Sequence, residues 1–269
     1  MGTKDENVRI DRLWPDPAED LSPAQLLEHY AFPERQGEAH DWLRVNFVTS
    51  LDGAVTRGGV SGPLGTAGDE AVFELLRRQA DVVMLGAGTA RKEGYGAMVL
   101  DDDAVAWRRD RGMPEQPVFA LVSGRLDLDP DSPIFTEAPV RPVVYTHRGG
   151  TSGAGADGGG LHAERRAALS EVADVVVVGE TGLEVGLLRA DLRARRLHRV
   201  HCEGGPTLFA ALLAAGAVDE LCLTAAPTVE SGLAGRITRG TSAVPTEMKL
   251  NGVLRCGNEL LLRYRTRRA

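Results

Sequence analysis

A glycine pair at the end of a short apolar strand has the clearest potential for chemistry in this chain. Residues 201–208 read HCEGGPTL. Gly204 and Gly205 permit a tight turn and a close approach of backbone to ligand, and Pro206 suits the first position of a helix. That helix would direct free N–H groups and the positive end of its dipole at the turn, which predicts an anion site, most often for phosphate. An ordinary strand-to-helix turn is the alternative.

One carboxylate ends a predicted strand, and another lies just past the end of one. Glu203 precedes the glycine pair, at the strand end where α/β proteins place substrate contacts. Asp52 follows the alternating strand 43–49 and precedes Gly53. A carboxylate there can donate a proton or hydrogen-bond a polar ring, so Asp52 is the candidate catalytic residue. In the alternative, Asp52 forms only an Asx turn with Gly53.

A second glycine-rich motif, residues 86–91, follows the apolar strand 81–85. It is similar to the dinucleotide fingerprint GxGxxG, but Arg91 stands in the sixth position, where helix–strand packing requires glycine or alanine. Residues 92–96 also favour a loop over a helix. The motif therefore indicates a dinucleotide or substrate loop of another kind.

Basic residues follow two more strands, 118–122 and 142–146. The first strand leads into Ser123 and Arg125, and the second leads into Arg148. A hydroxyl followed by a basic residue at a strand end can hold the 2′-phosphate that separates NADPH from NADH. Exposed loop arginines are the alternative interpretation.

The elements that position these groups alternate regularly along the chain. Strands are predicted at residues 43–49, 81–85, 118–122, 142–146, 174–178, 199–203 and 219–225, followed by a hairpin of 253–255 and 259–264. Helices are predicted between them, including one that Thr66 caps and one over 21–30 that Ser22 caps. The pattern predicts an α/β fold with three layers, α/β/α, and a mostly parallel mixed sheet with a C-terminal antiparallel hairpin. Residues 1–41 are expected to be an N-terminal extension of a domain formed by residues 42–269.

Composition excludes several classes of function. A net charge of −7 without a basic face argues against a nucleic-acid or membrane surface. The three cysteines lack CxxC spacing, which fits buried thiols in a reducing cytoplasm and argues against zinc or disulfides. No apolar run approaches the ~20 residues of a membrane helix. We therefore expect a cytoplasmic protein with no metal site.

Several motifs recur together in one known family. They are NFVTSLDG (46–53), LLR (75–77), GTA (88–90), EGGPTL (203–208), VDEL (218–221) and AP (226–227). Residues 42–266 thereby resemble the RibD C-terminal family, the reductase domain of bacterial riboflavin biosynthesis, with its dihydrofolate-reductase-like fold. The resemblance implies an NADPH-dependent reductase, usually homodimeric. Its substrate would be 5-amino-6-(5-phosphoribosylamino)uracil, whose ribosylamino chain becomes a ribitylamino chain.

The resemblance also implies a set of site residues. Asp52 would be the active-site carboxylate, and Ser61, Arg77 and Glu203 would face the substrate. The residues expected at NADPH are Pro63, Gly88, Thr89, Glu93, Ser123, Arg125, Arg148, Gly204, Gly205, Pro206 and Thr207.

One departure from the family bears on the substrate. Reductases of the phosphorylated pyrimidine usually carry an arginine about ten residues after the GT loop, whereas residues 97–103 here read AMVLDDD. Three hypotheses therefore stay open: the riboflavin-pathway reductase, an NADPH-dependent reductase of another pyrimidine or a pterin such as dihydrofolate, and a nucleotide-binding module without turnover.

Overall fold

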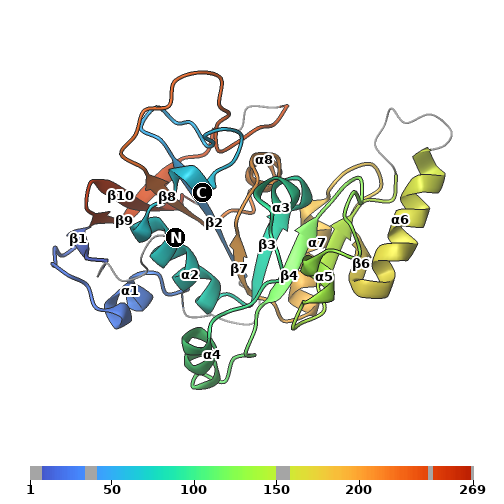
Figure 1. The fold of residues 1–269 in the computed structure, drawn as a ribbon, viewed down its shortest axis with the longest axis horizontal. Coiled ribbons are helices and arrows are strands. Elements are labelled where there is room, and N and C mark those ends of the chain that lie inside the picture. Colours follow the sequence, from blue (N-terminus) through green and yellow to red (C-terminus); the bar gives the residue numbers. More distant parts are fainter. Residues whose placement is uncertain (1–7, 34–40, 150–157, 242–244, 268–269) are drawn as a thin grey trace.

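The framework of the molecule is one mixed sheet (Figure 1). The computed structural model describes residues 8–33, 41–149, 158–241 and 245–267. The strands are β1 (Ile10–Trp14), β2 (Trp42–Thr49), β3 (Val82–Gly86), β4 (Val118–Val122), β5 (Val143–Thr146), β6 (Asp174–Val177), β7 (Arg199–Cys202), β8 (Glu220–Ala225), β9 (Met248–Cys256) and β10 (Glu259–Thr266). Their order is β1-β9-β10-β8-β2-β7-β3-β4-β5-β6. The strands from β8 to β6 run parallel, and β10, β9 and β1 extend the sheet antiparallel.

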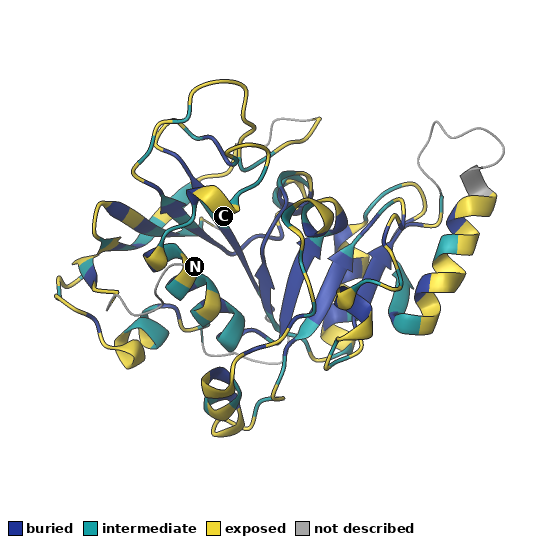
Figure 2. Ribbon diagram, in the orientation of Figure 1, coloured by how far each residue is buried: buried dark blue, intermediate teal, exposed yellow. Residues whose placement is uncertain are grey.

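Helices cover both faces of this sheet. They are α1 (Pro23–His29), α2 (Ala67–Gln79), α3 (Ala87–Glu93), α4 (Asp102–Arg109), α5 (Pro133–Thr136), α6 (Gly158–Val172), α7 (Val185–Ala194) and α8 (Pro206–Ala214), with a short 3-10 turn η1 (Gly62–Leu64). Successive strand side chains point to opposite faces, so Met84 joins the core under α7 and α8, whereas Leu85 joins the core that includes Leu169 of α6. Figure 2 shows the central strands buried and the outer helix faces exposed. The predicted three-layer architecture is confirmed.

The N-terminal segment is part of the sheet. β1 pairs antiparallel with β9, and Ile10, Leu21 and Tyr30 pack in a third core cluster with residues of α2 and β10. Helix α1 begins as predicted, because Ser22 and Gln25 form a reciprocal capping box. The edge strand β1 was not predicted.

Two helices differ from the sequence expectation. Residues 87–93 form helix α3, where a loop was predicted, and the helix ends at Gly94 with a φ of 70°. Helix α4 occupies the acidic stretch that was noted only as a departure from the family. Asp101 caps it. Asp102 and Asp103 stand in its first turn, where their negative charges interact favourably with the positive end of the helix dipole.

A buried ion network fastens the parallel half of the sheet to the antiparallel half. Glu220 on β8 accepts from Arg44 on β2 at 2.5 Å and from Arg263 on β10 at 2.9 Å, and all three side chains are almost fully buried. Arg44 also donates to the carbonyl of Tyr30. Burial alone would raise the pKa of Glu220, but the two guanidiniums lower it to about 2.

Among the described residues, no helix has the length and apolar character needed to span a bilayer.

We expect Glu220→Gln to lower the free energy of unfolding by about 3–5 kcal/mol, because two buried guanidiniums lose their counter-charge. Chemical denaturation measures the loss. Glu247→Gln, at an exposed ion pair with Arg267, is the matched control and should leave stability unchanged. Since the pKa of Glu220 is lowered from 4.5, its contribution is present above that pH and is lost as the pH falls through about 2. Equal effects of the two variants would contradict the assigned role.

Candidate active site

A cleft of about 1620 Å³ opens at the carboxyl ends of the parallel strands. Its walls come from the end of β2, helix α2, the turn from β3 into α3, the turn from β7 into α8, and the loops 55–65 and 235–241. Ligands of open α/β sheets bind at this end of the strands. The volume exceeds the ~300–1,000 Å³ of a single small-ligand pocket, so there is room for a dinucleotide beside a second molecule.

The turn between β7 and α8 is packed too tightly for side chains. A Cβ on Gly204, whose φ is 90°, would lie 2.9 Å from the ring of Phe47, and a Cβ on Gly205 would overlap the Thr89 hydroxyl. The Gly204 carbonyl accepts from the N–H of Gly86 at 2.8 Å. The peptide bond between the two glycines is cis. The ends of β7 and β3 are thereby joined, and α8 and α3 begin side by side (Figure 1).

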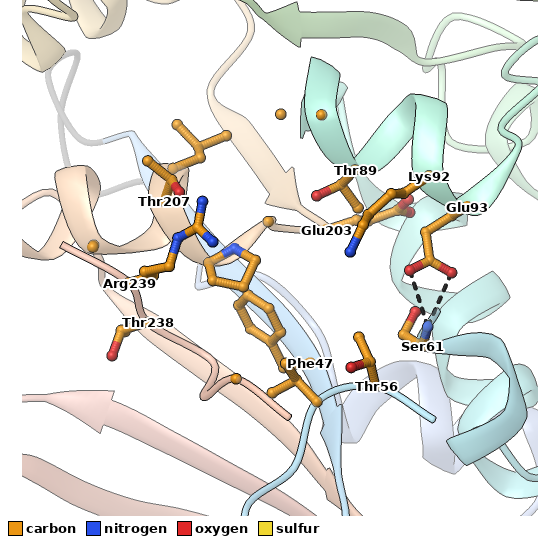
Figure 3. Close-up of a pocket in the computed structure, with 18 of the residues that line it drawn as sticks. Phe47, Thr56, Ser61, Thr89, Lys92, Glu93, Glu203, Thr207, Thr238 and Arg239 are labelled. Carbon is orange, nitrogen blue, oxygen red and sulfur yellow. Dashed lines mark hydrogen bonds between the residues drawn. The ribbon is translucent and has the colours of Figure 1, made fainter. Parts of the chain in front are cut away.

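The beginning of α8 has the features of an anion site. Gly205 is the N-cap and makes no side-chain capping bond, and Pro206 occupies the first turn. The N–H of Arg239 donates to the carbonyl of Pro206, and Figure 3 shows the Arg239 guanidinium beside Thr207. Within the described residues that guanidinium has no hydrogen bond or ion pair. Free helix amides next to an unpaired cation fit a phosphate group.

An ion pair forms the wall opposite. Arg77 on α2 holds both oxygens of Glu203, at 2.5 and 2.8 Å, and its guanidinium lies 4.2 Å from the Phe73 ring centre. The Tyr95 hydroxyl donates to Glu203 at 3.0 Å. Burial would raise the pKa of Glu203, but Arg77 outweighs it and lowers the pKa to about 2. Glu203 is therefore a fixed negative charge that orients Arg77 and Tyr95.

Helix α3 contributes a carboxylate and an ammonium to the same cleft. Both oxygens of Glu93 accept from the N–H of Ser61, at 2.9 and 3.1 Å (Figure 3). Lys92 extends into the cleft and donates to the carbonyl of Gly59 at 3.2 Å. Glu93 thus fixes the position of the loop that carries Ser61.

Asp52 lies outside the lining of the cleft, in an exposed loop. Its carboxylate accepts from the Ser50 hydroxyl at 2.5 Å and from the N–H groups of Glu230 and Ser231 at 3.1 and 2.8 Å. The Ser50 bond and the two backbone bonds lower the pKa of Asp52 to about 2. A carboxyl group with this pKa is ionised at neutral pH, and its three hydrogen bonds anchor two loops to each other.

The other predicted residues divide into two groups. Those that line the cleft are Ser61, Arg77, Gly88, Thr89, Glu93, Glu203, Gly205, Pro206 and Thr207. Those outside its lining, besides Asp52, are Pro63, Ser123, Arg125, Arg148 and Gly204. Gly62, Gly124 and Gly205 do line the cleft, so all of these except Arg148 are immediate sequence neighbours of a lining residue. Arg148 differs, because it is exposed and pairs with Glu180 at 3.0 Å.

Several cleft residues were not predicted from the sequence. Phe73 and Asp69 lie one and two helical turns before Arg77 on α2, so the spacing of four residues could have found them. Arg239 stands in an irregular loop, where periodicity carries no signal.

Fold and site together define an α/β protein with a large cleft where two βα turns meet. The sequence matches the RibD C-terminal domain over residues 41–262, and the chain belongs to that family. The 2,5-diamino-6-ribosylamino-4(3H)-pyrimidinone 5′-phosphate reductase of Methanothermobacter thermautotrophicus is 28% identical over 233 residues, 83% of this chain and 97% of that protein.

Two solved structures are similar in fold. A pyrimidine reductase-like protein from Corynebacterium diphtheriae has a TM-score of 0.77 and 29% identity, over 85% of this chain and 93% of the other. A diaminohydroxyphosphoribosylaminopyrimidine deaminase/5-amino-6-(5-phosphoribosylamino)uracil reductase from Thermotoga maritima has a TM-score of 0.60 and 17% identity, over 85% and 57%. The second likeness concerns the fold alone.

Gly205→Asp should weaken NADPH binding by about a hundredfold or more, because the side chain displaces Thr89 and brings a negative charge to the α8 amides. Titration calorimetry measures the affinity. Gly186→Asp is the matched control, since Gly186 opens another helix, α7, with no atom near its Cβ position. Unchanged affinity in a folded Gly205→Asp protein would refute the phosphate site.

Asp52→Asn should reduce kcat by less than about tenfold, because an amide oxygen can still anchor the loop. A general acid would instead lose ~10²–10⁴-fold. Steady-state kinetics decides between these roles, and a loss in the larger range would restore Asp52 as the catalytic residue.

Proposed function

We propose that this chain is an NADPH-dependent reductase that acts on a phosphorylated ribosylaminopyrimidine in riboflavin biosynthesis. The observation that carries the proposal is the junction of Gly205 with Thr89, which leaves free helix amides at one end of a cleft large enough for two ligands. Membership of the RibD C-terminal domain family and the reductase activity named for the relative from Methanothermobacter thermautotrophicus support the same reaction class.

The cofactor end of the cleft fits a dinucleotide. Gly205 and Thr207 would face the pyrophosphate, Thr89 would contact it from α3, and Arg239 would add a positive charge. When bound, a reduced nicotinamide supplies a hydride, and the protein supplies orientation. Gly124 lines the cleft beside Arg125, whose exposed side chain has no partner among the described residues. Arg125 is therefore the better placed of the two predicted selectors of the 2′-phosphate.

The substrate end lies against α2 and the loop that carries Ser61. Phe73 offers an apolar surface for the pyrimidine ring. The charged groups of Arg77 and Glu203 next to Phe73 hold each other in place. Lys92, three residues after Thr89, supplies a cation on this side of the cleft, and the phosphate arginine usual further along, at about residues 97–103, is absent. The hydride would reach the sugar carbon bound to the side-chain nitrogen, held open as an imine.

NADPH oxidation with two candidate substrates, and with no substrate as the control, tests the function. We expect turnover with a phosphorylated 6-ribosylaminopyrimidine and none with dihydrofolate or with NADPH alone. Turnover of dihydrofolate alone would replace the proposal with a pterin reductase, and binding without any turnover would leave a nucleotide-binding module.

A homodimer in the cytoplasm is part of the same proposal, and light scattering measures the oligomeric state.

Arg125→Ala should weaken NADPH binding by about ten- to a hundredfold and leave NADH binding nearly unchanged, since only NADPH loses a charge-assisted bond. Arg148→Ala is the control, because Arg148 is exposed and already paired with Glu180. Calorimetry with both dinucleotides measures the effect. Equal losses for NADPH and NADH would exclude Arg125 as the selector.

A further inference from the structure

Helix α2 presents one stripe of side chains to the cleft, and the proposed reaction assigns no role to its first member, Asp69. Asp69, Phe73 and Arg77 are spaced by four residues and all line the cleft. Residues at this spacing lie above one another on one helix face. Asp69 therefore lies at the N-terminal end of the cleft wall that α2 forms, two helical turns away from the Arg77–Glu203 pair.

The Asp69 carboxylate is only half used by the protein. Oδ1 accepts from the hydroxyl of Thr224 on β8 at 2.5 Å, whereas no described residue hydrogen-bonds Oδ2. Burial raises the pKa of Asp69 to about 6, the Thr224 bond opposes the rise, and the charges of Glu259 and Glu70 add to it. An ionised carboxylate accepts hydrogen bonds only, so Oδ2, which faces the open cleft, is free to accept from a donor on a bound molecule.

A second polar group lies on the same wall. Asn46 lines the cleft, is 8% exposed, and its side-chain amide makes no hydrogen bond within the described residues. In the register of β2 with β8, Val48 is opposite Thr224, so Asn46, Val48 and Thr224 share one face of the sheet. The Asn46 amide therefore adds a second polar group that is available to a molecule bound against this face of the cleft.

The substrates named for the Methanothermobacter thermautotrophicus and Thermotoga maritima proteins differ in the hydrogen-bond donors that their rings can offer to a carboxylate. In 2,5-diamino-6-ribosylamino-4(3H)-pyrimidinone 5′-phosphate, ring N3–H and the 2-amino group are adjacent donors. In 5-amino-6-(5-phosphoribosylamino)uracil, a carbonyl oxygen replaces the 2-amino group. One carboxylate can accept from both donors of the first ring, but its second oxygen would face the carbonyl of the other.

We propose that Asp69 is a specificity residue that accepts hydrogen bonds from the N3–H and 2-amino donors of the ring, so that this reductase prefers the 2-amino pyrimidinone to the uracil. The inference rests on the proposed function and narrows its substrate. Asp69 acts by positioning the ring, and the chemistry at the sugar carbon is unchanged.

The test compares kcat/KM for the two pyrimidines in wild type and in Asp69→Asn. Wild type should prefer the 2-amino pyrimidinone. The variant should lose about ten- to a hundredfold on that substrate, the value of one charge-assisted hydrogen bond, and less than about threefold on the uracil. Glu74→Gln is the matched control, because Glu74 is exposed on the same helix and does not line the cleft.

The pH profile provides an independent readout. Ionised Asp69 is needed to accept both donors, so kcat/KM for the 2-amino substrate should fall as the pH drops below about 6, and Asp69→Asn should lack this decline. The acidic neighbours Glu70 and Glu259 remain in both proteins, so they cannot account for a difference between the two profiles.

Each result has a distinct meaning. Equal losses on both pyrimidines in a folded Asp69→Asn protein would reduce Asp69 to a structural partner of Thr224 and overturn the inference. A wild-type preference for the uracil would overturn it while the proposed function stands. Turnover of neither pyrimidine would refute the proposed function, and calorimetry of both ligands would then still decide the preference.

Discussion

The close contact between two βα turns is the constraint on which the site depends. Gly205 comes so near to Thr89 that a side chain has no space, and the Gly204 carbonyl binds the Gly86 amide. Neighbouring strands β3 and β7 therefore end at one level, and their helices start side by side. Amide groups that secondary structure leaves unsatisfied are thus gathered at one place in the cleft.

The opposite wall depends on a different part of the fold. α2 packs over the sheet face formed by β8, β9 and β10, and the buried network of Arg44, Glu220 and Arg263 holds the parallel and antiparallel halves together. The Arg77–Glu203 pair then connects α2 to the end of β7, beside the glycine turn. One short stretch of chain consequently fixes both walls: Glu203 holds Arg77 on α2, and Gly205 packs against Thr89 on α3.

The sequence predicts local features well and non-local features poorly. Strand alternation, the Ser22 and Thr66 caps and the Gly-Gly turn are local signals, and each was found in its predicted place. Strand β1 was missed because its edge position depends on pairing with β9, more than 230 residues away. Helix α3 was missed because it is short and contains Gly88 and Thr89, which have low helix propensity. Tertiary packing outweighs this low propensity in the folded protein.

The same limit applies to the site. A carboxylate at a strand end has one sequence signature whether it faces a substrate or anchors a loop, and only the bonds to Glu230 and Ser231 separate the two for Asp52. Asp69 lies three residues after the cap residue Thr66, whose side chain accepts from its N–H, and this capping pattern alone accounts for Asp69 in the sequence. Arg239 reaches the α8 turn through an irregular loop, which no spacing rule describes.

The central claim is that one cleft brings a reduced nicotinamide to the sugar carbon of a ribosylaminopyrimidine. Turnover with NADPH deuterated at C4 of the nicotinamide tests it most directly, with mass spectrometry of the product. The account predicts one deuterium at the first carbon of the new ribityl chain. A product with deuterium in the pyrimidine ring, or with none from either C4 face, would contradict it.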